Sequence, residues 1–262
     1  MAAEHKDQIR HQVWPKLREV ALPDSRFHYD FASFIADFDG SEEATRRLAE
    51  LPCFRHADVV FITPDNCLEE LRYLALRQGK TVLVTTYGIR RGFWILDPHV
   101  INTAEKQRLA SFLDVMEKPG LGRHITLAEM QRRNLKVELM VTGTGAINLA
   151  GVRFGKGHGF FDLEWGMLSS IGVVTDQVPC IATVHDCQVL DEELHPEIFD
   201  TVCDFIVTPS RVITAVESAL VPKPHCGIFW DKLQPGMLDD IPPLKELQEL
   251  ERAAAAGKIN GN

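Results

Sequence analysis

The first apolar positions of the chain recur at helical spacing. They lie at steps of four, four and three on one face of a predicted helix over residues 4–20: Ile9, Val13, Leu17 and Val20. Lys6 and Arg10 are four residues apart, so they stack on the polar side of this helix. The following stretch, 23–40, is rich in aromatic residues without a clear period, which favours a covering loop. A second helix is expected at 41–51.

Beyond residue 57, short apolar runs alternate with helical stretches. The runs are continuous, as is typical of parallel strands covered on both faces. We expect strands at 58–63, 81–85, 137–141, 171–174, 180–184 and 204–208, and helices at 66–78, 103–117 and about 161–170. A polar segment, 118–136, interrupts the alternation. Strands interleaved with helices predict an α/β fold, a three-layer sandwich with a mostly parallel central sheet and right-handed crossovers.

The C-terminal region has the pattern of a surface helix. Its apolar positions are Leu244, Leu247 and Leu250, followed by Ala253–Ala256 and a polar end. We find no internal repeat, low-complexity segment or linker in the sequence. One domain is therefore expected over residues 1–262, with a C-terminal helical extension at about 222–262.

Composition and charge narrow the function classes. The chain has 262 residues, 45% of them hydrophobic and 25% charged, as in an ordinary globular protein. With 28 Lys and Arg against 37 Asp and Glu, the formal net charge is −9. Nucleic-acid binders attract phosphate backbones with a clustered basic surface, so this balance argues against a nucleic-acid partner. It does not exclude a phosphate ligand in a local basic pocket.

The sequence contains no sign of a membrane span or a disulfide framework. The first residues lack an apolar leader, and no apolar run reaches the roughly 18 residues of a membrane helix. The cysteines are scattered without a C-x-x-C pair, and His185-Asp186-Cys187 with Cys180 fits no common zinc spacing. We therefore expect a soluble cytoplasmic protein with reduced thiols and no membrane partner. The sequence leaves the oligomeric state open.

The glycine-rich segment before the helix at 161–170 carries the strongest candidate chemistry. Glycines at alternate positions let successive backbone N–H groups turn toward one point, and the following helix adds its positive N-terminal end: Gly155, Gly157 and Gly159. Arg153 and Lys156 supply compensating positive charge for a phosphate. Asp162 can cap the helix, hold Mg²⁺ beside the phosphates, or do both.

Two known glycine fingerprints fit this region poorly. A P-loop requires Ser or Thr after Gly-Lys, whereas Gly157 follows Lys156. The stretch 143–148, Gly-Thr-Gly-Ala-Ile-Asn, follows a predicted strand but lacks the third glycine of a dinucleotide-binding motif. An NAD(P)-binding Rossmann enzyme is therefore a weak alternative, and it requires that a helix open directly after this stretch.

The segment 151–162, Gly-Val-Arg-Phe-Gly-Lys-Gly-His-Gly-Phe-Phe-Asp, resembles the signature of 5-formyltetrahydrofolate cyclo-ligases, also called methenyltetrahydrofolate synthetases. Further matches follow in family order: Lys6-x-x-x-Arg10, Gly79-Lys80, Gln188 and the segment 200–208. The continuation Asp-Leu-Glu-Trp-Gly-Met-Leu and the stretch 221–230 are most similar to the branch of methenyltetrahydrofolate synthetase domain-containing proteins.

The resemblance implies a cyclo-ligase fold of the NagB, RpiA and CoA-transferase type. It also implies ATP- and Mg²⁺-dependent conversion of 5-formyltetrahydrofolate to 5,10-methenyltetrahydrofolate. In that reaction the formyl oxygen attacks the γ-phosphate, N10 closes on the activated carbon, and phosphate leaves. Such phosphoryl transfer depends mainly on positioning and on positive charge around the phosphate oxygens.

By the same resemblance, site roles fall on particular positions. The implied ATP-binding residues are Lys6, Arg10, Arg153, Gly155, Lys156, Gly157, His158, Gly159 and Phe160. Lys156 and Arg153 are the implied catalytic residues, and Asp162 is the implied metal ligand. The implied contacts to the folate substrate are Asp65, Ile147 and Gln188.

Departures from the family pattern concentrate on the folate side. Phe160 and Phe161 replace the usual Tyr pair, Leu163 a basic residue, and Phe199 a His, while Leu68 stands where a Thr is usual. The phosphate half of the site is better preserved than the folate half. Two further hypotheses therefore stay open: a close variant acting on another N-acyl substrate, and a non-catalytic relative that binds nucleotide or folate.

Overall fold

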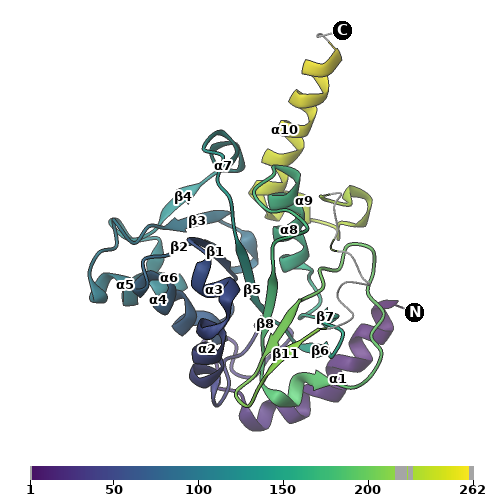
Figure 1. Cartoon of the computed structure of the whole chain (residues 1–262). Helices are drawn as coiled ribbons and strands as arrows, with labels where there is room; N and C mark the ends of the chain where they lie inside the picture. Colours follow the sequence, from purple (N-terminus) through teal and green to yellow (C-terminus); the bar gives the residue numbers. More distant parts are fainter. Residues whose placement is uncertain (1, 216–222, 224–226, 260–262) are drawn as a thin grey trace.

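A large central sheet organises the protein (Figure 1). The computed structural model describes residues 2–215, 223 and 227–259. The sheet has 8 strands in the order β11-β10-β8-β5-β1-β2-β3-β4. Its central strands run parallel: β10 (Phe205–Val207), β8 (Cys180–Thr183), β5 (Leu139–Gly143), β1 (Val59–Ile62) and β2 (Thr81–Thr85). The antiparallel strands lie at the two edges: β11 (Val212–Thr214), β3 (Phe93–Leu96) and β4 (Arg123–Ile125).

Alternate side chains of the central strands enter two separate apolar cores. On β1, Phe61 packs into one core, whereas Val60 and Ile62 pack into the other. Leu83 on β2 and Met140 on β5 join Phe61, and their strand neighbours point the opposite way. A sheet buried on both faces requires continuously apolar strands, which is the pattern in the sequence. The predicted three-layer α/β sandwich with a mostly parallel sheet is thus confirmed.

Helices cover both faces of the sheet. The face of Val60 carries helices from the first half of the chain: α2 (Ser41–Glu50), α3 (Pro52–His56), α4 (Glu69–Arg77), α5 (Ala104–Ser111) and α6 (Leu113–Met116). The face of Phe61 carries later helices: α7 (Leu127–Arg132), α8 (Phe160–Ser170), α9 (Met237–Asp240) and α10 (Pro242–Ile259). None of the described helices is long and apolar enough to cross a membrane.

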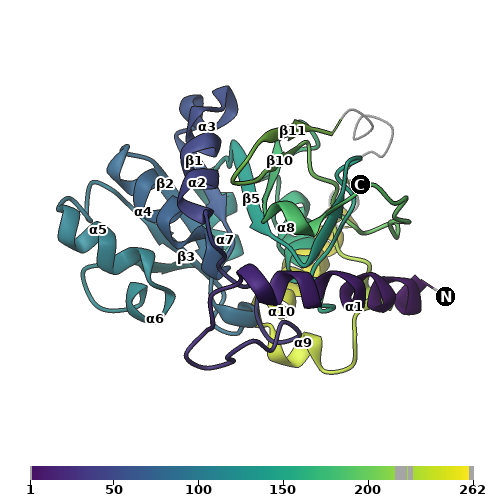
Figure 2. The same ribbon diagram turned by 90° about the horizontal axis from the view of Figure 1, so that it is seen from below.

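A second, smaller sheet lies beside the central one. It has 3 strands in the order β7-β6-β9: β7 (Arg153–Phe154), β6 (Ala146–Asn148) and β9 (Val189–Leu190). Helix α1 (Ala2–Val20) runs along this sheet at one end of the molecule (Figures 1 and 2). Ile9 and Val13 of α1 pack against Ala146 and Phe154. This packing brings the N-terminal basic residues next to the glycine-rich segment.

The C-terminal helix α10 packs on the core only at its start. Leu244 and Leu247 are buried against the α8 face of the sheet, and Leu250 is partly buried. Residues 251–256 are exposed, and this half of the helix projects from the body of the protein (Figure 1).

Some predicted elements are wrong. Residues 171–174 form a turn after α8 instead of a strand, with Gly172 at φ +71° and the Val173 N–H bonded to the Leu168 carbonyl. Their apolar run reflects burial in the core, which periodicity alone cannot distinguish from a strand. The helix expected at 103–117 breaks at Phe112, whose ψ is 122°. The polar segment 118–136 contains β4 and α7.

A buried arginine fastens the loop that follows β1. The side chain of Arg72 on α4 is 1% exposed. Its Nη1 donates to the carbonyl oxygens of Thr63 at 2.8 Å and Asp65 at 3.2 Å, and its Nε donates to the Ser111 carbonyl at 3.0 Å. Burial lowers the pKa of Arg72 to about 10, so the guanidinium is charged at neutral pH. The position of Asp65 therefore depends on α4.

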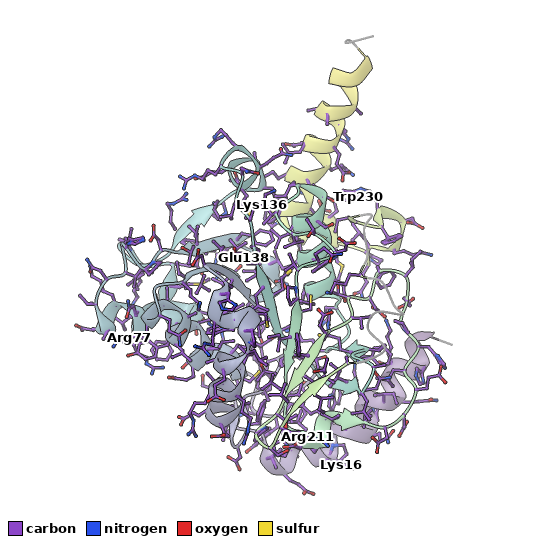
Figure 3. The ribbon with its side chains drawn as sticks, in the orientation of Figure 1. Lys16, Arg77, Lys136, Glu138, Arg211 and Trp230 are labelled. Carbon is purple, nitrogen blue, oxygen red and sulfur yellow. The ribbon has the colours of Figure 1, made fainter. Side chains whose placement is uncertain are left out.

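Replacing Arg72 with leucine should lower the free energy of unfolding by about 3 kcal/mol, because it leaves buried carbonyl oxygens without a donor. Urea unfolding curves measure this change. Arg77→Leu is the matched control, since Arg77 is exposed at the end of the same helix (Figure 3). Its change should stay within about 0.5 kcal/mol. Equal losses in both variants would show that the Arg72 hydrogen bonds do not stabilise the fold.

Candidate active site

A cavity of about 400 Å³ opens at the carboxyl ends of the central strands. Its walls come from α1, the loops after β1 and β2, the glycine loop with the start of α8, and two later segments, 197–200 and 227–237. This volume lies within the range of small-molecule sites, and ligands of open α/β sheets bind at this end of the strands. The cavity is therefore the candidate active site.

The glycine loop, residues 155–159, leads from β7 into α8. Gly157 has φ +109° and Gly159 φ +66°, conformations that residues with a Cβ rarely adopt. Arg10 Nε donates to the Gly155 carbonyl at 2.7 Å, and Gln234 Nε2 donates to the Gly157 carbonyl at 3.1 Å. Gly159 precedes the first residue of α8, and no side chain in the described part of the chain caps this helix. The N–H groups of its first turn are thus suited to an anion.

Basic residues gather beside this loop. Lys6 Nζ lies 2.8 Å from Glu197 and 2.7 Å from Asp200. Arg153 is 6% exposed and pairs with Asp162 at 2.6 Å. Its Nε is buried without a hydrogen-bond partner among the described residues. An unpaired buried donor on the wall of a cavity fits an anionic ligand.

In the Arg153–Asp162 ion pair, Arg153 is buried and Asp162 is half-buried. Burial works against the Arg153 cation, but the nearby carboxylates of Asp162 and Asp200 raise its pKa. Burial raises the pKa of Asp162, while Arg153 and the Thr201 N–H, 2.8 Å from Oδ1, favour the carboxylate. The pair ties β7 to α8 and to the segment that carries Asp200.

Lys156 turns away from these groups toward an aromatic wall. Its Nζ donates to the Ser33 carbonyl at 3.1 Å and lies 4.5 Å from the ring centre of Tyr87 and 5.5 Å from that of Phe160. Burial lowers its pKa, and the charge of Asp65 opposes that change. Lys156 therefore lies in the half of the cavity that contains Asp65.

Two carboxyl groups line this second half, Asp65 half-buried and Glu164 buried. Asp65 Oδ2 accepts hydrogen bonds from Thr63 Oγ1 and, at 2.8 Å, from the Gly143 N–H. Glu164 on α8 is 1% exposed and accepts a hydrogen bond from Thr85 Oγ1. Burial raises the pKa of both groups, to about 8 for Glu164. The cavity thus has two halves. The ionic half contains the ion pairs of Lys6 and Arg153, and the second half contains Lys156, Asp65 and Glu164, whose carboxyl group has a pKa of about 8.

The structure brings together most of the residues that the sequence singled out. Those that line the cavity are Lys6, Arg10, Asp65, Arg153, Gly155, Lys156, Gly157, His158, Gly159, Phe160 and Asp162. Ile147 and Gln188 do not line it. Ile147 is fully buried in the apolar core, and Gln188 Nε2 donates to the carbonyls of Thr144 at 2.7 Å and Gly145 at 3.2 Å. From this position they support the chain behind the site.

The Rossmann alternative is wrong. The stretch 143–148 leads from β5 into strand β6, and no helix opens there. A dinucleotide motif needs that helix, because its N-terminus binds the pyrophosphate. The helix that faces the cavity is α8, which follows the other glycine-rich stretch.

Several lining residues escaped the sequence analysis. Glu164 is the clearest, and a signal existed: it is a charged residue within the otherwise apolar stretch 163–168. Thr63 and Thr86 directly follow β1 and β2, the place where ligands of parallel sheets bind. Tyr87 comes from a 3-10 turn, Tyr87–Ile89, that no periodic pattern marks.

The fold and the site together define an α/β protein with a cavity and a glycine loop at the carboxyl edge of its sheet. The chain belongs to the 5-formyltetrahydrofolate cyclo-ligase family, whose model matches residues 2–209. The resemblance drawn from the glycine-rich signature is thereby confirmed.

The chain is also similar to individual known proteins. A methenyltetrahydrofolate synthase domain-containing protein of Danio rerio is 36% identical over 254 residues, which cover 96% of this chain and 63% of the relative. That of Homo sapiens is 35% identical over 253 residues, covering 95% and 63%. The chain thus spans about 63% of the length of these relatives. The NMR structure of Aquifex aeolicus 5,10-methenyltetrahydrofolate synthetase aligns with TM-score 0.48 and 17% identity, over 80% of this chain and 93% of that one.

The Glu164 carboxyl group should make stability depend on pH. The ordinary pKa of this side chain is 4.5, whereas the folded protein holds it at about 8. Between these values the folded state keeps a proton that the unfolded state releases, so its contribution to stability falls as the pH rises. Glu164→Gln is neutral throughout. The variant should gain thermal stability over the wild type from pH 5 to pH 8, by roughly 2–4 °C per kcal/mol.

Melting temperatures at pH 5, 6, 7, 8 and 9 test this expectation. Glu105→Gln is the matched control, because Glu105 is exposed on α5. A difference between Glu164→Gln and the wild type that stays constant across this pH range would contradict the assignment.

Proposed function

We propose that the protein catalyses the ATP- and Mg²⁺-dependent conversion of 5-formyltetrahydrofolate to 5,10-methenyltetrahydrofolate. The observation that carries the proposal is the meeting of the uncapped N-terminus of α8 with Lys6, Arg10 and Arg153 on one cavity wall. Family membership favours the same reaction. The described chain acts in this proposal as one cyclo-ligase-like domain, with 227–259 as its C-terminal extension.

The residues present fit the phosphates of a nucleotide. The loop N–H groups and the start of α8 offer donors, Lys6 and Arg10 offer charge, and the Arg153 Nε donor is unpaired among the described residues. Bound ATP supplies the phosphoryl group that activates the formyl oxygen. In this arrangement Arg10 holds the loop through Gly155, and the cations balance charge on the phosphate oxygens.

Mg²⁺ fits as an ion shared with the nucleotide. Among the described residues no group of three or more His, Cys, Asp or Glu could hold a metal on its own. Mg²⁺ commonly takes one or two carboxylates together with phosphate oxygens, and its charge then offsets that of the phosphates. Asp162 is the proposed carboxylate, because it lies in the first turn of α8, directly after the glycine loop, and lines the cavity.

A second candidate function is binding of nucleotide or folate without turnover. It is favoured by the position of Lys156, the expected catalytic cation, which is engaged by the Ser33 carbonyl and the Tyr87 ring. Phe160 and Phe161 also lack the hydroxyl groups of the usual Tyr pair. The same cavity would then hold its ligands without activating them.

Purified protein mixed with ATP, Mg²⁺ and 5-formyltetrahydrofolate should produce the near-ultraviolet absorbance of the methenyl product. Omitting ATP or chelating Mg²⁺ should abolish the signal. Folded protein that gives no product contradicts the proposed reaction. Calorimetric titration with ATP and with 5-formyltetrahydrofolate then decides whether the second candidate holds.

Lys6→Met should weaken ATP binding by about tenfold or more. The substitution removes a cation from the phosphate half and leaves the carboxylates of Glu197 and Asp200 to repel the ligand. The control is Lys16→Met, because Lys16 is an exposed lysine on the same helix (Figure 3). Dissociation constants from calorimetry should change for Lys6→Met only. Equal dissociation constants for ATP in both variants would contradict the placement of Lys6 in the phosphate site.

A further inference from the structure

The segment 227–237 packs along α8 and forms one wall of the cavity (Trp230 in Figure 3). It lies beyond residue 209, where the match to the family model ends. Gly166 of α8 shows how close the two elements are, because a Cβ at this position would lie 2.8 Å from the Gly227 carbonyl oxygen and 2.7 Å from Ile228 Cδ1. Leu233 and Met237 pack against the core that contains α8. The segment is thus anchored to the body of the protein.

One contact of this segment reaches the glycine loop. Gln234 Nε2 donates to the Gly157 carbonyl, and Arg10 Nε donates to the Gly155 carbonyl. Two side chains from different elements therefore hold alternate carbonyl groups of the loop. In a trans peptide unit the N–H group points away from the carbonyl oxygen. Each of these hydrogen bonds thus also fixes the direction of the N–H group of the following residue, which is a potential donor to an anion.

A second contact of the segment reaches Lys6 through two aromatic rings. The Lys6 ammonium lies 5.1 Å from the ring centre of Phe154 and 5.6 Å from that of Phe199. Phe199 in turn packs against Phe229, with ring centres 6.1 Å apart. Without Phe229, one of the two rings beside the Lys6 cation would lose its support. The segment therefore acts on two separate donors of the ionic half, a loop N–H group and a lysine.

We propose that the segment 227–237 is a clasp that holds the ionic half of the cavity in the form that binds a chain of phosphates, with Phe229 and Gln234 as positioning residues. A polyphosphate fits, because the two groups that the clasp positions are both donors to phosphate oxygens and come from different elements. Neither contact reaches Asp65 or Glu164, so binding of the second substrate should not depend on the clasp. The inference rests on the proposed function, since it concerns how that site holds the nucleotide.

Calorimetric titrations with tripolyphosphate, a non-hydrolysable ATP analogue and 5-formyltetrahydrofolate test the clasp. Gln234→Met removes the hydrogen-bond donor, and Phe229→Ala removes the ring. Gly166→Ala pushes the segment away from α8 without changing a residue of the cavity wall. Gln248→Met is the matched control, because Gln248 lies on α10 and does not line the cavity. Melting temperatures report whether each variant is folded.

We expect Gln234→Met and Phe229→Ala each to weaken binding of tripolyphosphate and of the ATP analogue about fivefold, and Gly166→Ala to weaken both about tenfold. Affinity for 5-formyltetrahydrofolate should change less than about twofold in each variant. Gln248→Met should match the wild type in all titrations.

Unchanged affinity for the phosphate ligands in folded Gln234→Met and Phe229→Ala would overturn the clasp. An equal loss of folate affinity would overturn it too, because it would show a general structural role. Wild type that binds neither phosphate ligand would overturn the clasp together with the proposed function. Wild type that binds them but forms no methenyl product would overturn the proposed reaction alone, since the clasp is decided by binding.

Discussion

The buried ion pair between Arg153 and Asp162 is the interaction on which the candidate site depends. Its partners come from β7 and from the first turn of α8, so the pair spans the glycine loop and holds both of its ends. Two charges removed from water are costly unless their geometry and additional hydrogen bonds offset the loss. Here the Thr201 N–H donates a further hydrogen bond to the Asp162 carboxylate. This contact joins the segment that carries Asp200 to the ion pair.

Around this pair the two sheets take different roles. The central sheet supplies Thr63, Asp65 and Thr86 after its parallel strands, and these groups line the half of the cavity that contains Glu164. The small sheet and α1 supply Arg153 and Lys6 to the ionic half. One helix, α8, reaches both halves, because its first turn faces the loop and its residue 164 faces β2. A ligand that fills the cavity would therefore contact both sheets at once.

Sequence reasoning succeeded where burial on both faces leaves a plain pattern. The continuous apolar runs of β1, β2 and β5 predicted a parallel sheet, and the alternate glycines predicted the loop before α8. It failed where short elements are held by tertiary contacts, as in β4 and the turn at 171–174. In the site, Lys6 and Arg153 could be predicted from the sequence because their side chains are positively charged. The protonation of Glu164 depends on neighbours from other elements, which no linear spacing reveals.

The hydrogen bond from Gln234 to the Gly157 carbonyl connects the glycine loop with a segment almost eighty residues later in the chain. Trp230 of that segment donates to Glu251 on α10 at 3.1 Å, and both Gln234 and Met237 line the cavity. During synthesis the loop, the sheet and α1 all leave the ribosome before this wall exists. The cavity is thus completed by the last part of the described chain, which is synthesised after the sheets that supply its other walls.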